Sequence, residues 1–290
     1  MNKETQMAKK IPMIMVRDLG YIYPNGTQAL KNINLNIYKG ELIAIMGKNG
    51  AGKTSLIRTL NGLIRPTEGN IFIEGENNNS KSIATLSKKV GIIFQNPLHQ
   101  LFSNSVEEEI RFSLKSFDLD REEIQIRIDK ILHEFNLEKY GKRSPLNLSG
   151  GESKKLAIAS IICRNPEILV FDEPTLGQDA KEIDFFINLI ENERKSGKTI
   201  IIITHNIEFA YEYLPRTILM ADGQIVADGP TKAILNNEIL IKQTSLIQPQ
   251  IWQFCNALKE SGFLKIETIM SKEALVNYLR NFLKNKPLKI

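Results

Sequence analysis

Apolar and polar residues alternate in the first part of the chain as half-buried β-strands require. Residues 33–37, Ile-Asn-Leu-Asn-Ile, alternate strictly, and residues 70–75 alternate in a similar way. A turn sequence at Tyr23–Gly26 interrupts the apolar pattern of residues 13–46, and a polar loop is expected at Glu76–Ser80. The chain is therefore predicted to begin partly as an antiparallel sheet.

Four short apolar runs have no polar alternation, which is typical of strands buried on both faces. They are residues 42–46, 90–94, 168–171 and 199–203, and the last two flank a helical pattern at 180–194. Strand–helix alternation of this kind predicts an α/β core with a parallel sheet. Each run is far shorter than the ~20 apolar residues that a membrane-spanning helix needs.

Residues from about 97 to 163, after the breaker Asn96-Pro97, are mostly helical in pattern and are interpreted as an inserted helical subdomain. Asp120 with Glu123 predicts a capping box at the start of one helix. The apolar face of that helix is formed by Ile124, Ile128, Ile131, Leu132 and Phe135.

The last sixty residues, 231–290, predict a C-terminal extension with two amphipathic helices. Gly262 is expected to end the first helix and Ser271 to cap the second. Such helices dock on their own domain or form a dimer contact, and the pattern leaves both open. Their apolar stripes are Ile251, Phe254, Cys255 and Leu258, then Leu275, Tyr278, Leu279, Phe282 and Leu283.

The composition is that of a globular protein: 290 residues, 42% hydrophobic and 24% charged. No apolar h-region follows the first ten residues, so no secretory signal is expected. The two cysteines, Cys163 and Cys255, have no metal-binding spacing and are interpreted as reduced core residues. The net charge of +5 favours an ordinary solvated surface over a phosphate-binding or anionic-membrane-binding face.

Residues 47–55, Gly-Lys-Asn-Gly-Ala-Gly-Lys-Thr-Ser, are the strongest chemical signal, because they lie between an apolar strand and a helix pattern. This is the context of the G-x-x-x-x-G-K-[ST] phosphate loop. Lys53 is expected to approach the β and γ phosphates, and the Thr54 hydroxyl to ligate Mg²⁺. The residues predicted to contact the nucleotide are Gly47, Asn49, Gly50, Ala51, Gly52, Lys53, Thr54 and Ser55.

Two carboxylates and one histidine follow core strands. Asp172 and Glu173 end the 168–171 run, where ligands of parallel sheets bind. Asp172 is suitably placed to help bind Mg²⁺. Glu173 is suitably placed to act as a general base that polarises a water. His205 follows the 199–203 run and is interpreted as functional. The alternatives are a surface turn for the carboxylates and a structural role for the histidine.

Residues 148–152, Leu-Ser-Gly-Gly-Glu, form a second glycine-rich helix start. Its amides and Ser149 could bind an anion, although a plain loop with an N-cap is the alternative. One ATP needs only one phosphate-binding loop. A second anion-binding helix start, formed by Ser149, Gly150 and Gly151, therefore suggests a site for ATP bound by another subunit.

Together these motifs resemble those of ATP-binding cassette (ABC) ATPase subunits over roughly residues 13–230. The resemblance implies a P-loop NTPase core with a mixed, mainly parallel sheet, an antiparallel β subdomain and the inserted helical subdomain. Seven motifs in order are more specific than any one of them. They are Tyr23, the phosphate loop Gly47–Thr54, Gln95, the Ser149–Gly151 signature, Asp172-Glu173, the Leu176–Asp179 D-loop and the His205 switch.

The resemblance also implies roles. Tyr23 would stack on adenine, unless it is only a core strand aromatic. Gln95 would touch Mg²⁺ or the attacking water and report the nucleotide state to a membrane partner, and Asp179 would help to hold two subunits together. ATP and Mg²⁺ are the implied cofactors, with two ATP molecules sandwiched between two ATPase subunits.

Four positions depart from the usual family pattern. Glu152 stands where Gln is usual, Lys154-Lys155 replace Gln-Arg, and Gln178 replaces Leu. The phosphate loop, Asp172, Glu173 and His205 are intact, so ATP hydrolysis is expected. The departures bear on the affinity of the closed dimer.

Residues 94–102, 105–110 and 175–179, with the C-terminal helices, resemble the ATPases of energy-coupling factor transporters, importers of vitamins or transition-metal ions. This implies a transmembrane scaffold protein, a substrate-binding membrane protein and a location on the cytoplasmic face of the membrane. No nucleic-acid partner is implied.

A scaffold groove would include Gln95, Leu101 and Phe102, which could instead pack the helical subdomain. The alternatives are another ABC importer type, a soluble regulatory or assembly ATPase, and a scaffold without turnover. The pattern reveals neither the cargo nor whether the ATPase pair is a homodimer or a heterodimer.

Overall fold

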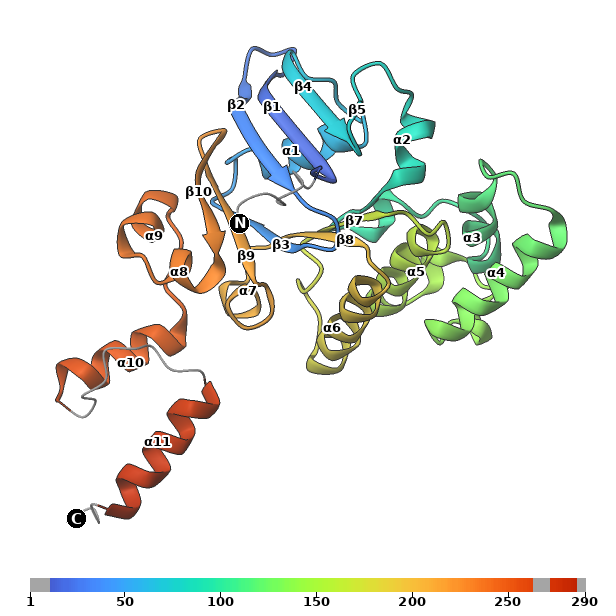
Figure 1. Cartoon of the computed structure of the whole chain (residues 1–290). Helices are drawn as coiled ribbons and strands as arrows, with labels where there is room; N and C mark the ends of the chain where they lie inside the picture. Colours follow the sequence, from blue (N-terminus) through green and yellow to red (C-terminus); the bar gives the residue numbers. More distant parts are fainter. Residues whose placement is uncertain (1–10, 263–271, 286–290) are drawn as a thin grey trace, which may run out of the picture.

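The structure, a computed structural model, describes residues 11–262 and 272–285 and contains two β-sheets (Figure 1). The larger sheet has the order β10-β9-β3-β8-β7-β6. Its parallel strands are β3 (Leu42–Met46), β6 (Val90–Ile93), β7 (Ile168–Asp172), β8 (Thr199–Ile203) and β9 (Arg216–Ala221). Strand β10 (Gln224–Pro230) pairs antiparallel with β9. The predicted α/β core with a mainly parallel sheet is confirmed.

The smaller sheet is antiparallel and has the order β2-β1-β4-β5. It contains β1 (Ile14–Ile22), β2 (Gln28–Ile37), β4 (Glu68–Ile73) and β5 (Glu76–Asn77). The Tyr23–Gly26 turn is confirmed, since the Gly26 amide donates to the Tyr23 carbonyl at 2.8 Å. The loop predicted at 76–80 is partly wrong, because its first two residues pair with the end of β4.

Alternation along the core strands divides the interior into two layers. In β3, Ile43 and Ile45 face the antiparallel sheet, whereas Ala44 and Met46 face the helices on the other side. Helix α1 (Lys53–Leu60) lies between the two sheets, and α5 (Gly150–Ile162), α6 (Ala180–Lys195) and α7 (Ile207–Tyr213) cover the opposite face (Figure 1). A strand buried on both faces needs no polar positions, which explains the continuous apolar runs.

The segment between β6 and β7 is mostly helical, with a short 3₁₀ turn at Pro97–His99, then α3 (Val106–Leu114), α4 (Arg121–Glu134) and α5. Further 3₁₀ turns lie at Glu138–Tyr140 and Pro145–Asn147. Asp120 caps α4 by accepting from the Glu123 amide at 2.8 Å. The capping box predicted there is not closed by Glu123, whose carboxylate accepts from Arg127 instead.

The remaining helices are α2 (Ile83–Lys89), α8 (Thr231–Leu235), α9 (Glu238–Thr244), α10 (Gln250–Glu260) and α11 (Lys272–Asn285). Helices α10 and α11 lie beyond α8 and α9 (Figure 1) and share a small cluster around Cys255 and Leu275. Gly262 follows α10 with φ +76°, as predicted, but Phe254 is half exposed rather than part of the stripe. The predicted cap Ser271 and the Leu283 side chain lie outside the described residues.

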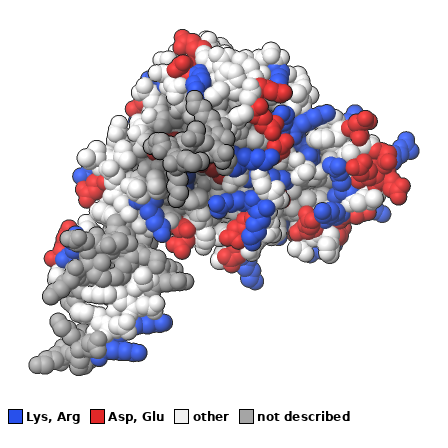
Figure 2. Space-filling model, in the orientation of Figure 1, with Lys and Arg blue, Asp and Glu red and all other residues white. Residues whose placement is uncertain are grey.

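Lysines, arginines and acidic residues are interspersed on the face drawn in Figure 2. Both cysteines are free and buried, and burial raises the pKa of the Cys163 thiol to about 12. Within the described ranges, no helix is long and apolar enough to cross a bilayer.

Candidate functional site

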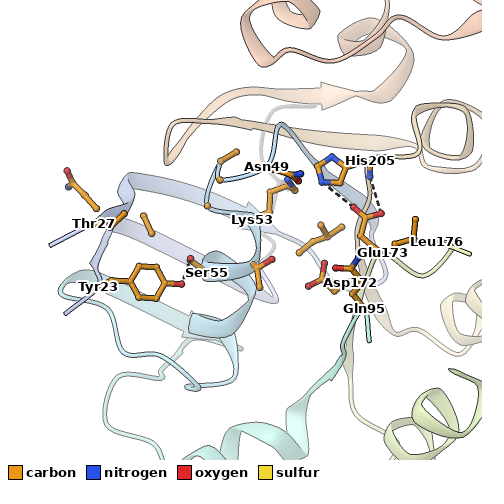
Figure 3. A pocket seen from close by; sticks show the side chains of 17 residues that line it. Tyr23, Thr27, Asn49, Lys53, Ser55, Gln95, Asp172, Glu173, Leu176 and His205 are labelled. Carbon is orange, nitrogen blue, oxygen red and sulfur yellow. Dashed lines mark hydrogen bonds and ion pairs between the residues drawn. The ribbon is translucent and has the colours of Figure 1, made fainter. Parts of the chain in front are cut away.

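A cleft of about 550 Å³ lies at the carboxyl ends of β3, β7 and β8 (Figure 3). Tyr23 and Ser55 lie on one side of it, whereas Gln95, Asp172, Glu173 and His205 lie on the other, with Lys53 between them. The volume falls in the range of small-molecule sites. The lining also includes Thr27, Gln28, Ala29, Asn49, Gly50, Ala51, Gly52, Thr54, Leu176 and Ile203.

The loop from β3 to α1 requires glycine where the chain passes other backbone. Gly47 has φ +143°, and a Cβ there would lie 2.0 Å from the Met220 carbonyl oxygen. Gly52 has φ +97°, and a Cβ there would lie 2.5 Å from the Ala29 carbonyl oxygen. Both contacts are with backbone atoms, which cannot move aside without a large energetic cost. Any other residue at Gly47 or Gly52 would therefore displace the loop.

Lys53 is 6% exposed, and its ammonium points back into this loop. Its Nζ donates to the carbonyls of Gly47 (2.7 Å) and Lys48 (3.0 Å). Burial lowers the pKa of Lys53, and the carboxylates of Glu173 and Asp172 oppose this shift. The start of α1 receives no side-chain cap from any residue that the structure describes. An ammonium and uncapped helix amides therefore converge at the cleft, as a phosphate requires.

Tyr23 lines the cleft from the loop between β1 and β2. Its hydroxyl is hydrogen-bonded to Ser55 Oγ at 2.9 Å, and its ring packs edge-on against Tyr21 with centroids 4.8 Å apart. The ring is therefore held in place while part of its surface stays accessible. The alternative role as a buried core aromatic applies to Tyr21, which is 9% exposed.

Asp172 is the last residue of β7 and lines the cleft together with Thr54 of α1. Burial, then the neighbouring Glu173 carboxylate, raises the pKa of Asp172, while Lys53 lowers it. A hydroxyl and a carboxylate side by side are hard oxygen donors of the kind that Mg²⁺ prefers.

Glu173 has a left-handed backbone conformation, φ +51°, immediately after β7. Its amide donates to the Ile203 carbonyl (2.9 Å), and its Oε2 accepts from the His205 amide (3.2 Å). Its buried Oε1 has no hydrogen-bond partner among the described residues, and His205 Nε2 lies 3.5 Å away. Burial raises the pKa of Glu173. Burial and then Lys53 lower the pKa of His205, which favours the neutral imidazole.

Five predicted nucleotide contacts are not among the residues that line the cleft: Gly47, Ser149, Gly150, Gly151 and Asp179. Gly47 belongs to the loop between β3 and α1, whereas the other four lie around the starts of α5 and α6, where two capping boxes are closed. Ser149 pairs with Glu152 and Asp179 with Glu182, each through reciprocal amide–side-chain bonds. An adjacent groove is lined by Gly150 and Gly151 together with Gln95 and Leu176.

The motif analysis does not predict every residue that lines or supports the cleft. Leu176 and Ile203 line the cleft, and the β9–β10 hairpin supports the phosphate loop through a bond from the Gly223 amide to the Ala51 carbonyl (3.2 Å). The Asp222-Gly223 dipeptide is a hairpin-turn signal that could have revealed this strand pair. Lys154 entered the sequence analysis only as a departure from the family pattern.

The groove predicted for a membrane scaffold is partly wrong. Leu101 is 5% exposed and packs in the core of the helical region, and Gln95 lines the nucleotide cleft. Phe102 is 65% exposed and packs edge-on against Phe112. These two rings line a separate hollow with Gln100 and Arg164.

Metal ligation at the cleft would need oxygens from the nucleotide. In residues 11–262 and 272–285, no group of three or more His, Cys, Asp or Glu side chains could hold a metal ion. Thr54 and Asp172 supply two protein oxygens. This fits Mg²⁺, because phosphates and water commonly complete the coordination shell of this ion.

Residues 30–176 match the family model described as ABC transporter. The chain is 38% identical over 253 residues to the energy-coupling factor transporter ATP-binding protein EcfA of Methanothermobacter thermautotrophicus, covering 87% of this chain and 81% of that one. Several longer relatives match as well, and the chain covers 43% to 64% of their lengths.

Two solved structures agree. The cbiO1 protein of Clostridium perfringens, described as part of the ABC transporter complex cbiONQ, superposes with a TM-score of 0.71 at 34% identity, covering 85% of this chain and 99% of that chain. The ATP-binding cassette MJ0796, described as dimeric in a post-hydrolysis state bound to ADP and Pi, gives 0.69 at 29% identity, covering 76% and 99%. The chain therefore belongs to the ATP-hydrolysing ATPase family of ABC transporters, with energy-coupling factor ATP-binding proteins among its relatives.

Proposed function

We propose that this chain is the motor ATPase of an energy-coupling factor-type importer. The observation that carries the catalytic part is the buried Oε1 of Glu173, a residue of the cleft lining; this oxygen has no hydrogen-bond partner among the described residues. A buried acceptor of this kind needs a partner, and a water at the γ-phosphate would supply one.

In this proposal Tyr23 stacks on the adenine, and the loop from Gly47 to Ser55 holds the phosphates. Lys53 exchanges its bonds to the Gly47 and Lys48 carbonyls for phosphate oxygens. This exchange needs no movement of the backbone, because the ammonium already lies within the loop. Thr54, Asp172 and Gln95 would hold Mg²⁺, which neutralises charge on the phosphates.

Glu173 then takes a proton from the attacking water at Oε1 as a general base. Burial raises its proton affinity, which suits this task, and the His205 amide holds Oε2 so that only Oε1 is free to react. The neutral imidazole of His205, beside Oε1, can donate a hydrogen bond toward the γ-phosphate and so orient the transferring group.

The Ser149–Gly151 signature and Asp179 would act on ATP held by a second ATPase subunit. They lie outside the cleft of their own subunit, and Gly150 and Gly151 line the groove that also contains Gln95 and Leu176. The dimeric, ADP-bound state described for the MJ0796 cassette supports this arrangement. The second subunit would be an identical copy or a paralogue.

The membrane partners would be a transmembrane scaffold and a separate substrate-binding membrane protein, which places this chain at the cytoplasmic face of the membrane. The hollow lined by Phe102 and Phe112 suits the scaffold, because large apolar side chains there are exposed. The EcfA relatives and the cbiONQ neighbour support this assignment. Vitamins or transition-metal ions are the proposed cargo classes.

The test is ATPase activity of the wild type and of Glu173→Gln, each alone and with the co-purified membrane scaffold. A general base contributes about 10²- to 10⁴-fold, so Glu173→Gln should lose at least about 100-fold in kcat and still bind ATP. Glu191→Gln, on the exposed face of α6, is the matched control and should retain wild-type kcat. Wild-type turnover that the scaffold stimulates supports a coupled motor; turnover indifferent to the scaffold would favour a soluble regulatory ATPase.

A further inference from the structure

Lys154 is a buried lysine in the second turn of α5, one helical turn after Gly150. It is only 7% exposed. Its Nζ donates to the Leu176 carbonyl at 3.1 Å and to the Glu173 carbonyl at 3.4 Å. Burial lowers the pKa of Lys154, and the carboxylates of Glu182 and Glu173 oppose this shift. A buried ammonium is retained only where its partners compensate for lost hydration.

The two carbonyls belong to the ends of one tight turn. The Leu176 amide donates to the Glu173 carbonyl at 3.3 Å, which closes the turn from Glu173 to Leu176. Glu173 begins the turn with φ +51°, a conformation that a glutamate adopts only when its surroundings hold it there. Lys154 bonds both ends of this turn from outside and so supplies part of that hold.

A second contact joins the same helix to the far end of the D-loop. A Cβ on Gly151 would lie 1.8 Å from Glu182 Oε1, so the Glu182 carboxylate rests against the glycine. Glu182 in turn closes the capping box with Asp179. The segment from Leu176 to Asp179 is therefore held against α5 at both ends, by Lys154 at one and Gly151 at the other.

We propose that Lys154 is a positioning residue that ties the Glu173–Leu176 turn to the start of α5, so that the base of one ATP site moves together with the signature that completes the other. The inference rests on the proposed function, in which Glu173 serves the subunit's own ATP and Ser149–Gly151 serve the partner's ATP. Binding of the partner's γ-phosphate at the start of α5 would then change the position of Glu173 through the side chain of Lys154.

The chemistry of lysine suits this task. An ammonium has three donors on a flexible stem and can bond two carbonyls that do not share a plane. Glutamine, which is usual at this position in the resembled family, is one bond shorter and neutral. Lys155, the next residue, points to the Phe185 ring instead, with Nζ 4.9 Å from the centroid.

The experiment compares steady-state ATPase kinetics of Lys154→Met, Lys154→Gln and Lys154→Arg in the full chain, with Lys155→Met as the matched control. Loss of both bonds misplaces the base but not the phosphate loop. Lys154→Met should therefore lose about tenfold in kcat, while KM for ATP changes less than about twofold. Lys154→Gln should lose severalfold, and Lys154→Arg, which keeps charge and donors, should stay within about threefold of wild type.

Thermal unfolding and binding of a fluorescent ATP analogue separate this result from a folding defect. Lys154→Met with wild-type kcat overturns the inference, as does an equal loss in Lys154→Arg or in Lys155→Met. If Lys154→Met does not fold, Lys154→Gln decides, and wild-type kcat there overturns the inference. An inactive wild type, or a fully active Glu173→Gln, would instead refute the proposed base, whatever the Lys154 variants do.

Discussion

The two glycine-rich helix starts of this chain differ in how their amides are satisfied. At α1 the first turn carries Lys53 and no acidic residue, and no described side chain caps it. At α5 the Ser149 hydroxyl accepts from the Glu152 amide and the Glu152 carboxylate accepts from the Ser149 amide. One start is therefore open and electropositive, whereas the other already holds its own anion.

This difference distinguishes a resident phosphate site, which a single subunit can fill, from a conditional one, which needs a partner subunit. A phosphate at α1 meets free amides and an ammonium without displacing any carboxylate. A phosphate approaching α5 competes with Glu152 for the same helix end. We infer that the phosphate loop binds ATP in a single subunit, whereas the signature acts only when a partner brings the phosphate close.

The largest expected effect is at the resident site. Lys53→Ala should weaken ATP binding to the single subunit by about 100-fold, because it removes the only ammonium bonded within the described part of the loop. Isothermal titration with ATP and Mg²⁺ measures this. Lys39→Met, an exposed lysine before β3, should bind as the wild type does, and equal losses in both variants would contradict the assignment.

The next effect separates the two helix starts. Ser149→Ala should leave ATP binding to the single subunit unchanged and lower kcat about tenfold, because the hydroxyl acts only on the partner's phosphate. Ser105→Ala, which removes an equivalent cap from α3, controls for lost helix stability. A binding defect in Ser149→Ala at low protein concentration would break the distinction.

The smallest effect sharpens the conditional site. Glu152→Gln keeps a capping box but removes the charge that competes with phosphate. A charge at a helix start contributes about 0.3–1 kcal/mol, so the ATP-bound dimer should tighten by about two- to fivefold. Sedimentation in a Glu173→Gln background measures the dimer constant. Glu123→Gln, at the same position of α4, should have no effect, and a weaker dimer in Glu152→Gln would contradict the competition.

Much of the fold could be predicted because its signals are local. The buried strands at 42–46, 168–171 and 199–203 are continuous apolar runs, and the structure reproduces them within a residue. Strand β5 and the β9–β10 pair were missed. The two-residue β5 is polar and exposed and forms only by pairing with the end of β4. Pairing depends on a partner strand, which a local pattern does not contain.

The predicted scaffold groove is partly wrong for a related reason. Leu101 and Phe102 are adjacent apolar residues with the same local signal, yet one is 5% and the other 65% exposed. The direction of each side chain is set by the packing of Leu101 into the core of the helical region. Likewise, the capping box expected from Asp120 and Glu123 does not close, because the Glu123 carboxylate accepts from Arg127 instead.

The sequence by itself determined which chemical groups this protein has: a phosphate loop, two carboxylates after one strand, a histidine after another and a second glycine-rich helix start. Motif order carries that information because each group lies within a few residues of its element. Only the tertiary structure decided that Glu173 is buried with one oxygen that has no hydrogen-bond partner among the described residues, and that Lys154 reaches its turn from α5. Burial and long-range hydrogen bonds depend on distances between segments far apart in the chain, and those distances exist only after folding.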